Sequence, residues 1–375
     1  MNIGVLGAGM VGRAIAEDLA GKYNVYSYDF SKENLCLLKI ASIKKCSADL
    51  QSYDQYSNLF SHIDMFVLAV PGFMGFETLK QLMGMKKNII DISFFPEDSL
   101  TLEALAKENN ITVITDCGVA PGMSNFLLGY WNEHMQVEKF LCYVGGLPKL
   151  RVLPFEYKAP FSPIDVLEEY QRPARYVENG HIVTREALSD IENIDFPFAG
   201  TLEAFNTDGL RSLMFTMPGI PDMKEKTLRY PGHASLIKSL IRAGYFSTEK
   251  IVLNGTQVSP LEVSQALLFR QWQLTDEDEE FTLMQIDIEG IQQGKSKKIS
   301  YLLYDERDKV TRTSSMSRTT GYACTAHVNL VAENIFSEKG IFPPEKVGKH
   351  EACYNYVMQY LEDRNIHYRM TENET

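Results

Sequence analysis

The 375-residue chain has no excess of basic residues, since 37 lysines and arginines face 49 aspartates and glutamates, for a formal net charge of −12. Binding to the phosphates of nucleic acid requires clustered lysine and arginine, and the sequence has no such cluster. The acidic run 276–280 is typical of a solvated turn, and the lysines at 295, 297 and 298 fall in an expected hairpin rather than on a membrane helix. We therefore expect no nucleic-acid partner.

Cysteines and long apolar runs are also few. The six cysteines have neither the paired spacing of a zinc site nor the density of a disulfide framework, and the seven histidines are scattered. No apolar run is long enough to span a bilayer. The first residues enter an apolar strand without the charged start and cleavage site of a signal peptide. These absences predict a cytoplasmic protein with no metal site and no membrane partner.

Length and composition indicate a soluble globular protein of more than one domain. Hydrophobic residues make up 45% of the chain and charged residues 23%, which is the usual balance for such proteins. A chain of 375 residues is too long for one ordinary core, so two or three domains are expected.

A glycine-rich turn near the amino terminus carries the clearest functional signal. An apolar strand at 2–6 precedes the sequence Gly-Ala-Gly-Met-Val-Gly, and a helical pattern over 13–20 follows it. The first glycine permits a tight turn, the second lets a pyrophosphate approach the backbone, and the third lets the helix pack closely on the strand. A glycine turn without a ligand is the alternative. The predicted cofactor-binding residues of this turn are Gly7, Gly9, Met10, Val11 and Gly12.

An acidic residue stands where a dinucleotide site requires one. The next strand, 24–28, ends at Asp29, which lies 22 positions after Gly7. A carboxylate there would hydrogen-bond the adenosine ribose hydroxyls and would repel a 2′-phosphate. No arginine follows in 30–34, although Lys32 would favour a 2′-phosphate. The predicted cofactor is therefore NAD rather than NADP.

Strands and helices alternate through the first 130 residues, which predicts a parallel sheet with crossover helices. Two strand ends supply further candidates. Ala69, Val70 and Pro71 end one strand at the usual position of a loop that touches the cofactor, although a Pro-Gly turn is often only a turn. Ser93 follows the next strand and could border the nicotinamide; alternatively, its two phenylalanine neighbours are simply core.

The stretch 116–125 joins this half of the chain to the rest. It contains two glycines and a proline after the apolar run 111–114, and a helical pattern follows from about residue 124. A turn at the carboxyl end of a strand in an open α/β sheet faces the ligand crevice, so Asp116 is a candidate site residue. The alternative is that Gly118 and Gly122 merely supply positive φ for a connection.

A second domain of α+β type is expected after residue 130. Alternating apolar residues at 281–289 and 298–305, with glycines between them, predict an antiparallel hairpin. Helical patterns at 326–336 and 351–364 need a partner for their apolar faces, and residues 370–375 form a polar tail that we expect to be disordered. We predict a discontinuous doubly wound Rossmann domain (1–130 and 316–375) and a mostly antiparallel substrate-binding and dimerisation domain (131–315).

The stretch 227–233 combines charge, small residues and turns. Arg229 could grip a carboxylate with its bidentate fork, and His233 could exchange a proton near neutral pH. A lone arginine or histidine is more often structural. The stretch 200–209 could supply Glu203, Thr207 or Asp208, or it could be a surface turn with helix caps.

Several of these stretches and others, spread in order over nearly the whole chain, match a known pattern: 7–12, 91–98, 116–122, 144–148, 201–205, 227–233 and 316–321. Together they resemble the saccharopine dehydrogenase-like family, and within it the lysine 6-dehydrogenases. The resemblance implies a Rossmann domain, an antiparallel catalytic domain that commonly also forms a dimer interface, and NAD(P)-dependent oxidation at a carbon that bears an amine. It also places three residues around the substrate, Asp116, Arg229 and His233, and four beside the cofactor, Ala69, Val70, Pro71 and Ser93.

One position departs from the pattern, since Val144 stands where many saccharopine reductases have a cysteine before Gly-Gly-Leu-Pro. This departure weakens a saccharopine assignment more than a lysine one. The resulting hypothesis is NAD-dependent oxidative deamination of the ε-amine of L-lysine to the 6-semialdehyde, which cyclises to piperideine-6-carboxylate as ammonia leaves. Asp116 is the first candidate for the base, His233 the second, and Arg229 would hold the α-carboxylate. The alternatives are a saccharopine dehydrogenase, a carboxynorspermidine-type reductase and a non-enzymatic NAD-binding sensor. A homodimer or homotetramer is expected.

Overall fold

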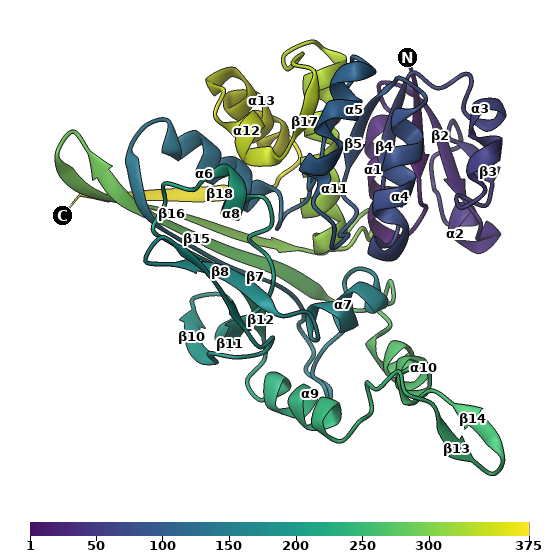
Figure 1. The fold of residues 1–375 in the computed structure, drawn as a ribbon, viewed down its shortest axis with the longest axis vertical. Helices are drawn as coiled ribbons and strands as arrows, with labels where there is room; N and C mark the ends of the chain where they lie inside the picture. Colours follow the sequence, from purple (N-terminus) through teal and green to yellow (C-terminus); the bar gives the residue numbers. More distant parts are fainter. Residues whose placement is uncertain (375) are drawn as a thin grey trace.

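The computed structural model describes residues 1–374, which form two large sheets with helices around them (Figure 1). The first sheet is parallel throughout and has the order β17-β6-β5-β4-β1-β2-β3. Its strands are β1 (Asn2–Leu6), β2 (Asn24–Asp29), β3 (Lys44–Ser47), β4 (Met65–Leu68), β5 (Asn88–Asp91), β6 (Thr112–Ile114) and β17 (Gly340–Phe342). The chain reverses direction across the sheet between β1 and β4, as in a doubly wound nucleotide-binding fold, so the predicted Rossmann architecture is confirmed.

Helices cover both faces of this sheet. Helix α1 forms directly after the glycine turn and buries Ile15 and Leu19, the two apolar residues whose spacing predicted it. Helix α1 spans Met10–Leu19. The other helices of this half are α2 (Lys32–Cys36), α3 (Tyr56–Leu59), α4 (Gly72–Met83) and α5 (Glu103–Glu108), with short 3-10 turns η1 (Tyr53–Gln55) and η2 (Ser99–Leu102). A later helix, α11 (Ser315–Ala332), returns to this half.

The second sheet is long and mostly antiparallel, and its central strands run beneath the nucleotide-binding half (Figure 1). Its order is β10-β11-β12-β7-β15-β16-β18, and only the β12–β7 pair on this path is parallel. The strands are β7 (Gln136–Pro148), β8 (Ala174–Glu178), β9 (His181–Arg185), β10 (Glu192–Phe196), β11 (Gly200–Asn206), β12 (Asp222–Arg229), β15 (Glu280–Gln292), β16 (Lys295–Glu306) and β18 (Tyr368–Glu374). The predicted hairpin is present as β15 and β16.

The remaining elements connect or extend the two halves. They are α6 (Met123–Asn132), α7 (Pro163–Glu169), α8 (Leu213–Thr216), α9 (His233–Arg242), α10 (Pro260–Trp272), α12 (Pro344–Gly348), α13 (Glu351–Glu362) and the small hairpin β13 (Ile251–Leu253) and β14 (Thr256–Val258). Helix α7 lies between the nucleotide-binding half and the second sheet, whereas the β13–β14 hairpin projects from the far end of the molecule (Figure 1). Within residues 1–374, no helix is long and apolar enough to cross a bilayer.

The chain returns to the first sheet through α11 and β17. Helix α11 packs against α1, and β17 pairs with β6, so one buried apolar cluster continues from β1 through α11 and α6 to β15. Helix α11 begins at Ser315, well before the helical pattern predicted at 326–336. The added turns carry the buried polar residues of 315–321. Glu280 is 1% exposed and accepts a hydrogen bond from the Ser315 backbone N–H (2.6 Å), so the predicted solvated turn is wrong at this residue.

The predicted disorder of the carboxyl-terminal tail is also wrong for the described residues. Residues 368–374 form β18, which pairs antiparallel with β16 of the second sheet, while Thr375 lies outside the described residues. The edge of β16 offers unpaired backbone groups, and a polar segment can satisfy them through its own backbone regardless of its side chains. The last strand therefore belongs to the second sheet, although the sequence assigned the whole stretch 316–375 to the nucleotide-binding domain.

Candidate active site

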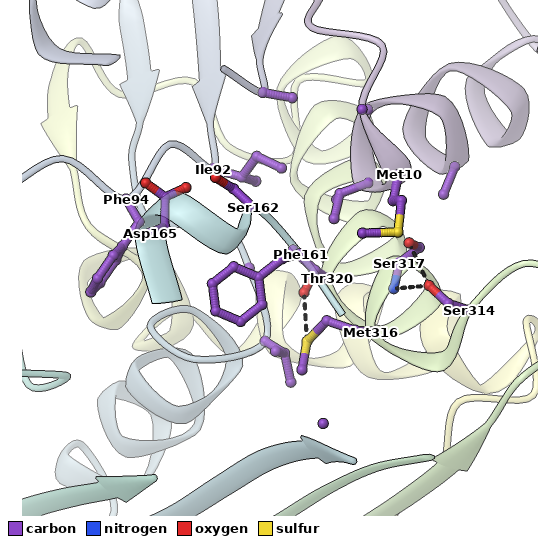
Figure 2. Close-up of a pocket in the computed structure, with 18 of the residues that line it drawn as sticks. Met10, Ile92, Phe94, Phe161, Ser162, Asp165, Ser314, Met316, Ser317 and Thr320 are labelled. Atoms are coloured by element: carbon purple, nitrogen blue, oxygen red, sulfur yellow. Dashed lines mark hydrogen bonds between the residues drawn. The ribbon is translucent and has the colours of Figure 1, made fainter. Parts of the chain in front are cut away.

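A cavity of about 750 Å³ lies along the carboxyl ends of the first sheet's strands and extends onto β7 and β12 of the second sheet. Figure 2 shows the Phe161 ring near the centre of this pocket, with Phe94 and Asp165 to one side and Met316 and Thr320 to the other. The cavity therefore begins where a doubly wound sheet binds its ligand and ends on the domain expected to bind substrate.

The glycine turn forms one end of the cavity. Gly7 has a φ of 102°, and a Cβ on Gly12 would lie 2.0 Å from the Gly7 carbonyl oxygen, so both positions require glycine. A Cβ on Gly9 would meet nothing within 4 Å, which leaves open space above the start of α1. Met10 and Val11 begin this helix and line the same space. The turn thus fits a pyrophosphate held at a helix amino terminus.

Asp29 closes β2 and fits the ribose of a bound dinucleotide. Its Oδ2 accepts the Ala8 backbone N–H at 2.6 Å and its Oδ1 accepts the Ser31 N–H at 2.8 Å, so the carboxylate is held in one orientation. Each oxygen retains acceptor capacity for a ribose hydroxyl. Arg13 and Lys39 line the same end of the cavity and would attract a phosphate. This end therefore fits the adenosine of NAD(P), and the preference for NAD stays a prediction.

Three of the four residues predicted from the strand ends to lie beside the cofactor line the cavity, and Ser93 does not. Ser93 is 2% exposed and does not line the cavity, although its neighbours Ile92 and Phe94 do. Its hydroxyl is buried without a hydrogen-bond partner, so Ser93 lies behind the cavity wall. The loop after β4 supplies three lining residues, Ala69, Val70 and Pro71.

Asp91, at the end of β5, is a fully buried carboxyl in the layer behind this wall. Its Oδ1 accepts the Ser93 backbone N–H at 3.0 Å, and its Oδ2 has no hydrogen-bond partner. Burial is the main cause that raises the pKa of Asp91 to about 8. This residue was not singled out from the sequence as part of the site.

Asp116 lines the cavity as predicted from the sequence, and it has a partner that the sequence did not reveal. Its φ of 55° lies in the left-handed region, which aspartate tolerates better than most residues. Its Oδ1 lies 3.1 Å from Arg211 Nη2, and both side chains are 6% exposed. Arg211 also donates a hydrogen bond to the Phe95 carbonyl. Asp116 is therefore held in a buried ion pair at the edge of the substrate end.

Arg229 also lines the cavity, at the end of β12. Its Nε donates to the Tyr170 hydroxyl at 2.9 Å, its Nη1 donates to a backbone carbonyl at 2.8 Å, and its Nη2 lies 3.5 Å from Glu169. The guanidinium stacks on the Tyr157 ring, 4.4 Å from its centroid. Most donors of Arg229 are thus used within the protein.

His233 is close to Arg229 but is not part of the cavity lining. It is 4% exposed, its Nε2 lies 2.9 Å from the Tyr170 hydroxyl, and its Nδ1 lies 3.0 Å from the Phe155 carbonyl. Burial, followed by the charge of Arg229, lowers the pKa of His233 to about 3. The imidazole is therefore neutral at physiological pH and supports the wall that carries Tyr170.

The stretch 200–209 contributes strand β11 and the loop after it rather than a surface turn. Glu203 accepts the backbone N–H groups of Gly232 and Ala234 at 2.8 and 2.5 Å, so it caps the start of α9. Thr207 and Asp208 line the cavity. Of the three polar candidates in this stretch, one is structural and two reach the site.

Asp165 on α7 lines the cavity, accepts the Gly72 backbone N–H at 3.2 Å and has no ion pair within residues 1–374. Four other carboxyl groups gather at the substrate end of the cavity. Three of them are each ion-paired with an arginine: Asp116 with Arg211 at 3.1 Å, Glu169 with Arg229 at 3.5 Å, and Asp208 with Arg175 at 2.7 Å. The fourth, Glu225 on β12, is 6% exposed and forms no ion pair with any residue of 1–374. Burial, followed by the charge of Glu169, raises its pKa to about 8.

Two arginines of the cavity wall have a buried nitrogen without a hydrogen-bond partner, Arg307 through its Nε and Arg172 through its Nη1. Of the two, Arg172 lies at the substrate end. Arg172 Nη2 lies 3.1 Å from Glu168, and the guanidinium lies 5.1 Å from the centroid of the Phe94 ring. Its Nη1 is buried and has no hydrogen-bond partner in the protein. Neither Arg172 nor Glu225 was found by reasoning from the sequence. In the described part of the chain, no group of three or more His, Cys, Asp and Glu side chains could hold a metal ion.

Comparison with known proteins gives two family matches that together span most of the chain. Residues 3–114 match the saccharopine dehydrogenase NADP binding domain, and residues 118–366 match the saccharopine dehydrogenase C-terminal domain. Their boundary falls within the stretch 114–118, at the hinge that precedes α6.

The curated proteins that resemble this chain are longer than it and share about a quarter of its residues over the aligned segments. The chain is 24% identical over 280 residues to the mitochondrial alpha-aminoadipic semialdehyde synthase of Rattus norvegicus, covering 70% of this chain and 30% of that protein. It is 25% identical over 199 residues to a saccharopine dehydrogenase [NADP(+), L-glutamate-forming] of Pyricularia oryzae, covering 50% of this chain and 44% of that protein. The chain thus spans less than half the length of these relatives.

Two solved structures share the fold over nearly the whole chain. Apo saccharopine dehydrogenase (L-Glu forming) from Saccharomyces cerevisiae superposes with a TM-score of 0.79, at 18% identity and 99% coverage of both chains. The homospermidine synthase from Legionella pneumophila in complex with NAD superposes with a TM-score of 0.66, at 12% identity, covering 100% of this chain and 91% of the other. At such identities the likeness establishes the architecture.

Proposed function

The chain belongs to the saccharopine dehydrogenase family, and we propose that it is an NAD-dependent amino-acid dehydrogenase that oxidises the ε-amine carbon of L-lysine. The observation that carries this proposal is the distribution of charge in the cavity. In the group around Glu225, three carboxylates have an arginine each and Glu225 has no cation within residues 1–374. At the same end of the cavity, Arg172 has an unpartnered donor. L-lysine brings one carboxylate and two ammonium groups, of which the carboxylate would complement Arg172 and the ε-ammonium would complement Glu225.

The cofactor assignment rests on the glycine turn and on Asp29. Open space above Gly9 and a helix start at Met10 suit the pyrophosphate, and the fixed carboxylate of Asp29 suits the ribose hydroxyls of NAD. When bound, the dinucleotide supplies the hydride acceptor. The chain's own residues have to position C6 of lysine against it and remove a proton from the amine.

The α-carboxylate needs a cation that is not already committed. Arg172 offers its buried, unpartnered Nη1, whereas Arg229 already shares its donors among Tyr170, Glu169 and a backbone carbonyl. We therefore assign the binding of the α-carboxylate to Arg172, while Arg229 holds Glu169 in the cavity wall. The assignment of this carboxylate to Arg229, made from the sequence, stays a prediction. A guanidinium–carboxylate contact at this end fixes the aliphatic chain along the cavity.

The reaction requires a free amine lone pair. The ε-ammonium, with a reference pKa of about 10.4, loses a proton to a protein group; C6 then loses hydride, and the resulting imine takes up water to give the semialdehyde and ammonia. The semialdehyde cyclises with its α-amine. Of the two bases predicted from the sequence, Asp116 lines the cavity and is paired with Arg211, whereas His233 does not line it. Both assignments stay predictions.

A saccharopine dehydrogenase or a carboxynorspermidine-type reductase is the second candidate. The similarity to the Pyricularia oryzae saccharopine dehydrogenase favours it. Such an enzyme joins an amine to an oxo acid and needs a second cation for the additional carboxylate. An NAD-binding sensor without turnover is the third candidate, and the polar substrate end argues against it.

The test is NADH formation, followed by near-ultraviolet absorbance, with purified protein, NAD and L-lysine, beside NADP, saccharopine and other diamino acids. A lysine-dependent rate without an added oxo acid supports oxidative ε-deamination. A rate only with saccharopine, or with an amine plus an oxo acid, refutes the lysine assignment in favour of reductive coupling. Sedimentation equilibrium on the same sample tests the expected homodimer or homotetramer.

A further inference from the structure

Glu225 occupies an unusual position among the charged groups of the cavity. It lies in the middle of β12, directly opposite Cys142 of β7 in the register of the second sheet. The next residue along the strand, Lys226, does not neutralise it, because the Lys226 ammonium binds Glu192 and the Asp190 carbonyl instead. Glu225 therefore faces the cavity without the cation that a buried carboxylate normally has.

The side chains that interact with the Glu225 carboxyl are polar or acidic. Helix α6 contributes the Ser124 hydroxyl, which donates to Glu225 Oε2 at 3.5 Å, and β7 contributes the Cys142 thiol. The charged groups that reach it are three carboxylates, Asp116 after β6, Glu169 on α7 and Asp208 after β11. Each of these already has its own arginine, so the cluster as a whole carries one uncompensated negative charge when Glu225 is ionised.

The backbone next to Glu225 is shaped to accommodate its carboxyl. A Cβ on Gly209 would lie 1.8 Å from Glu225 Oε1, so only glycine lets the loop after β11 pass this close. A carboxyl that is buried without a cation is costly for folding, so the position calls for an explanation.

We propose that Glu225 binds the substrate's ε-amine and accepts its proton, a role that rests on the proposed function. A substrate ammonium supplies the one positive charge that the cluster lacks. The Arg172 grip at the wall and Glu225 on β12 would then hold the two ends of L-lysine within the same cavity.

The proton-transfer step balances without any additional reagent. The ionised Glu225 carboxylate takes one proton from the ε-ammonium and becomes a carboxylic acid, and the amine is left neutral with a free lone pair. A bound dinucleotide would supply the two-electron oxidant by accepting hydride from C6, which would leave the protonated imine, and water would convert this imine to the aldehyde and ammonium. The proton on Glu225 returns to solvent before the next cycle.

Because burial raises the pKa of Glu225 to about 8, the free protein holds this proton at pH 7. Binding of an ammonium beside the carboxyl favours its ionised form, so binding releases about one proton per lysine at pH 7. Isothermal calorimetry of the NADH complex in two buffers of different ionisation enthalpy measures this release without turnover. L-norleucine, which lacks the ε-amine, serves as the matched ligand and is expected to release none.

The variant Glu225→Gln keeps the shape and removes the charge. We expect it to release no proton with lysine and to lose at least about 100-fold in kcat. The rise in kcat/KM that we expect for the wild type as pH passes about 8 should be absent. NADH binding is expected to stay unchanged. The control is Glu345→Gln, another buried carboxyl, which contacts Asn125 and Thr216, lies outside the cavity lining and is expected to keep wild-type kinetics.

Different failures have different meanings. If the wild type oxidises lysine but Glu225→Gln keeps its proton release or its pH profile, the role of Glu225 is refuted and the proposed function stands. If the wild type turns over saccharopine but no primary amine, or oxidises no amine at all, the proposed function fails and the role of Glu225 fails with it.

Discussion

The buried, unpaired carboxyl of Glu225 has a consequence for stability that can be measured without any substrate. In the unfolded chain a glutamate titrates near 4.5, whereas burial raises the pKa of Glu225 to about 8 in the folded protein. Between these two values the folded protein holds a proton that the unfolded chain has released. Stability contributed by this group is therefore full below pH 4.5 and is lost progressively as pH rises toward 8.

The size of the effect follows from the change in pKa. Each tenfold change in proton affinity is worth about 1.4 kcal/mol, so moving this pKa from 4.5 to about 8 costs the folded protein about 5 kcal/mol at alkaline pH. Glutamine has the same shape and no proton to lose. The unfolding free energy of Glu225→Gln relative to wild type is thus expected to rise by about 4 kcal/mol between pH 5 and pH 9.

Urea unfolding of both proteins, followed by circular dichroism across this pH range, tests the expectation. The control Glu333→Gln removes a carboxylate that accepts from Lys22 and whose pKa is lowered chiefly by that hydrogen bond. Because this carboxylate is ionised in both states above pH 5, its effect is nearly constant from pH 5 to pH 9, and it stays below about 1 kcal/mol because the pair is exposed. A free-energy difference for Glu225→Gln that is constant with pH would refute the claim that Glu225 is buried without a cation.

Three further predictions concern the cofactor and the substrate grip. Gly9→Ala should fold normally but bind NAD at least tenfold more weakly, measured by fluorescence titration. Gly12→Ala should instead lower the melting temperature, because its Cβ would lie 2.0 Å from a carbonyl oxygen. Equal Tm values for the two variants would contradict this. Asp29→Asn should reduce the ratio of kcat/KM for NAD over NADP at least tenfold, since it removes the charge that repels a 2′-phosphate and keeps one acceptor oxygen. Arg172→Gln should raise the KM for lysine about tenfold with a smaller change in kcat, and an unchanged KM would return the carboxylate grip to Arg229.

The nucleotide-binding half could be predicted because its signals are local. Gly7, Gly9, Gly12 and Asp29 lie within one strand-turn-helix-strand unit. The backbone requires glycine at 7 and 12, whereas Gly9 leaves space for a pyrophosphate and Asp29 suits a ribose. The hairpin of β15 and β16 was likewise visible in the alternation of apolar residues. Strand β18 was missed because its pairing is nonlocal: the edge of β16, distant in sequence, makes a polar segment into a strand.

The substrate end could be predicted only in part, because its ion pairs join distant segments. Asp116 and Arg211 are 95 residues apart in sequence, and no local pattern connects them. For Glu225 a usable signal existed. Side chains alternate along a strand, so Glu225 had to share the face of Arg229, four residues later, but its neighbours Lys224 and Lys226 gave the segment the appearance of a solvated edge.

The balance of charges also bears on the choice between lysine and saccharopine. Saccharopine carries three carboxylates and a secondary amine, so it would bring three negative charges to a cavity where three arginines are already paired with aspartate or glutamate. Only Arg172 has an uncommitted buried donor among the arginines at this end. Two substrate carboxylates would then be desolvated without a cation, and an unpaired buried charge costs several kcal/mol. Under the proposed function L-lysine avoids this cost, because its one carboxylate would meet Arg172 and its ε-ammonium would meet Glu225, so we expect saccharopine to be the poorer substrate.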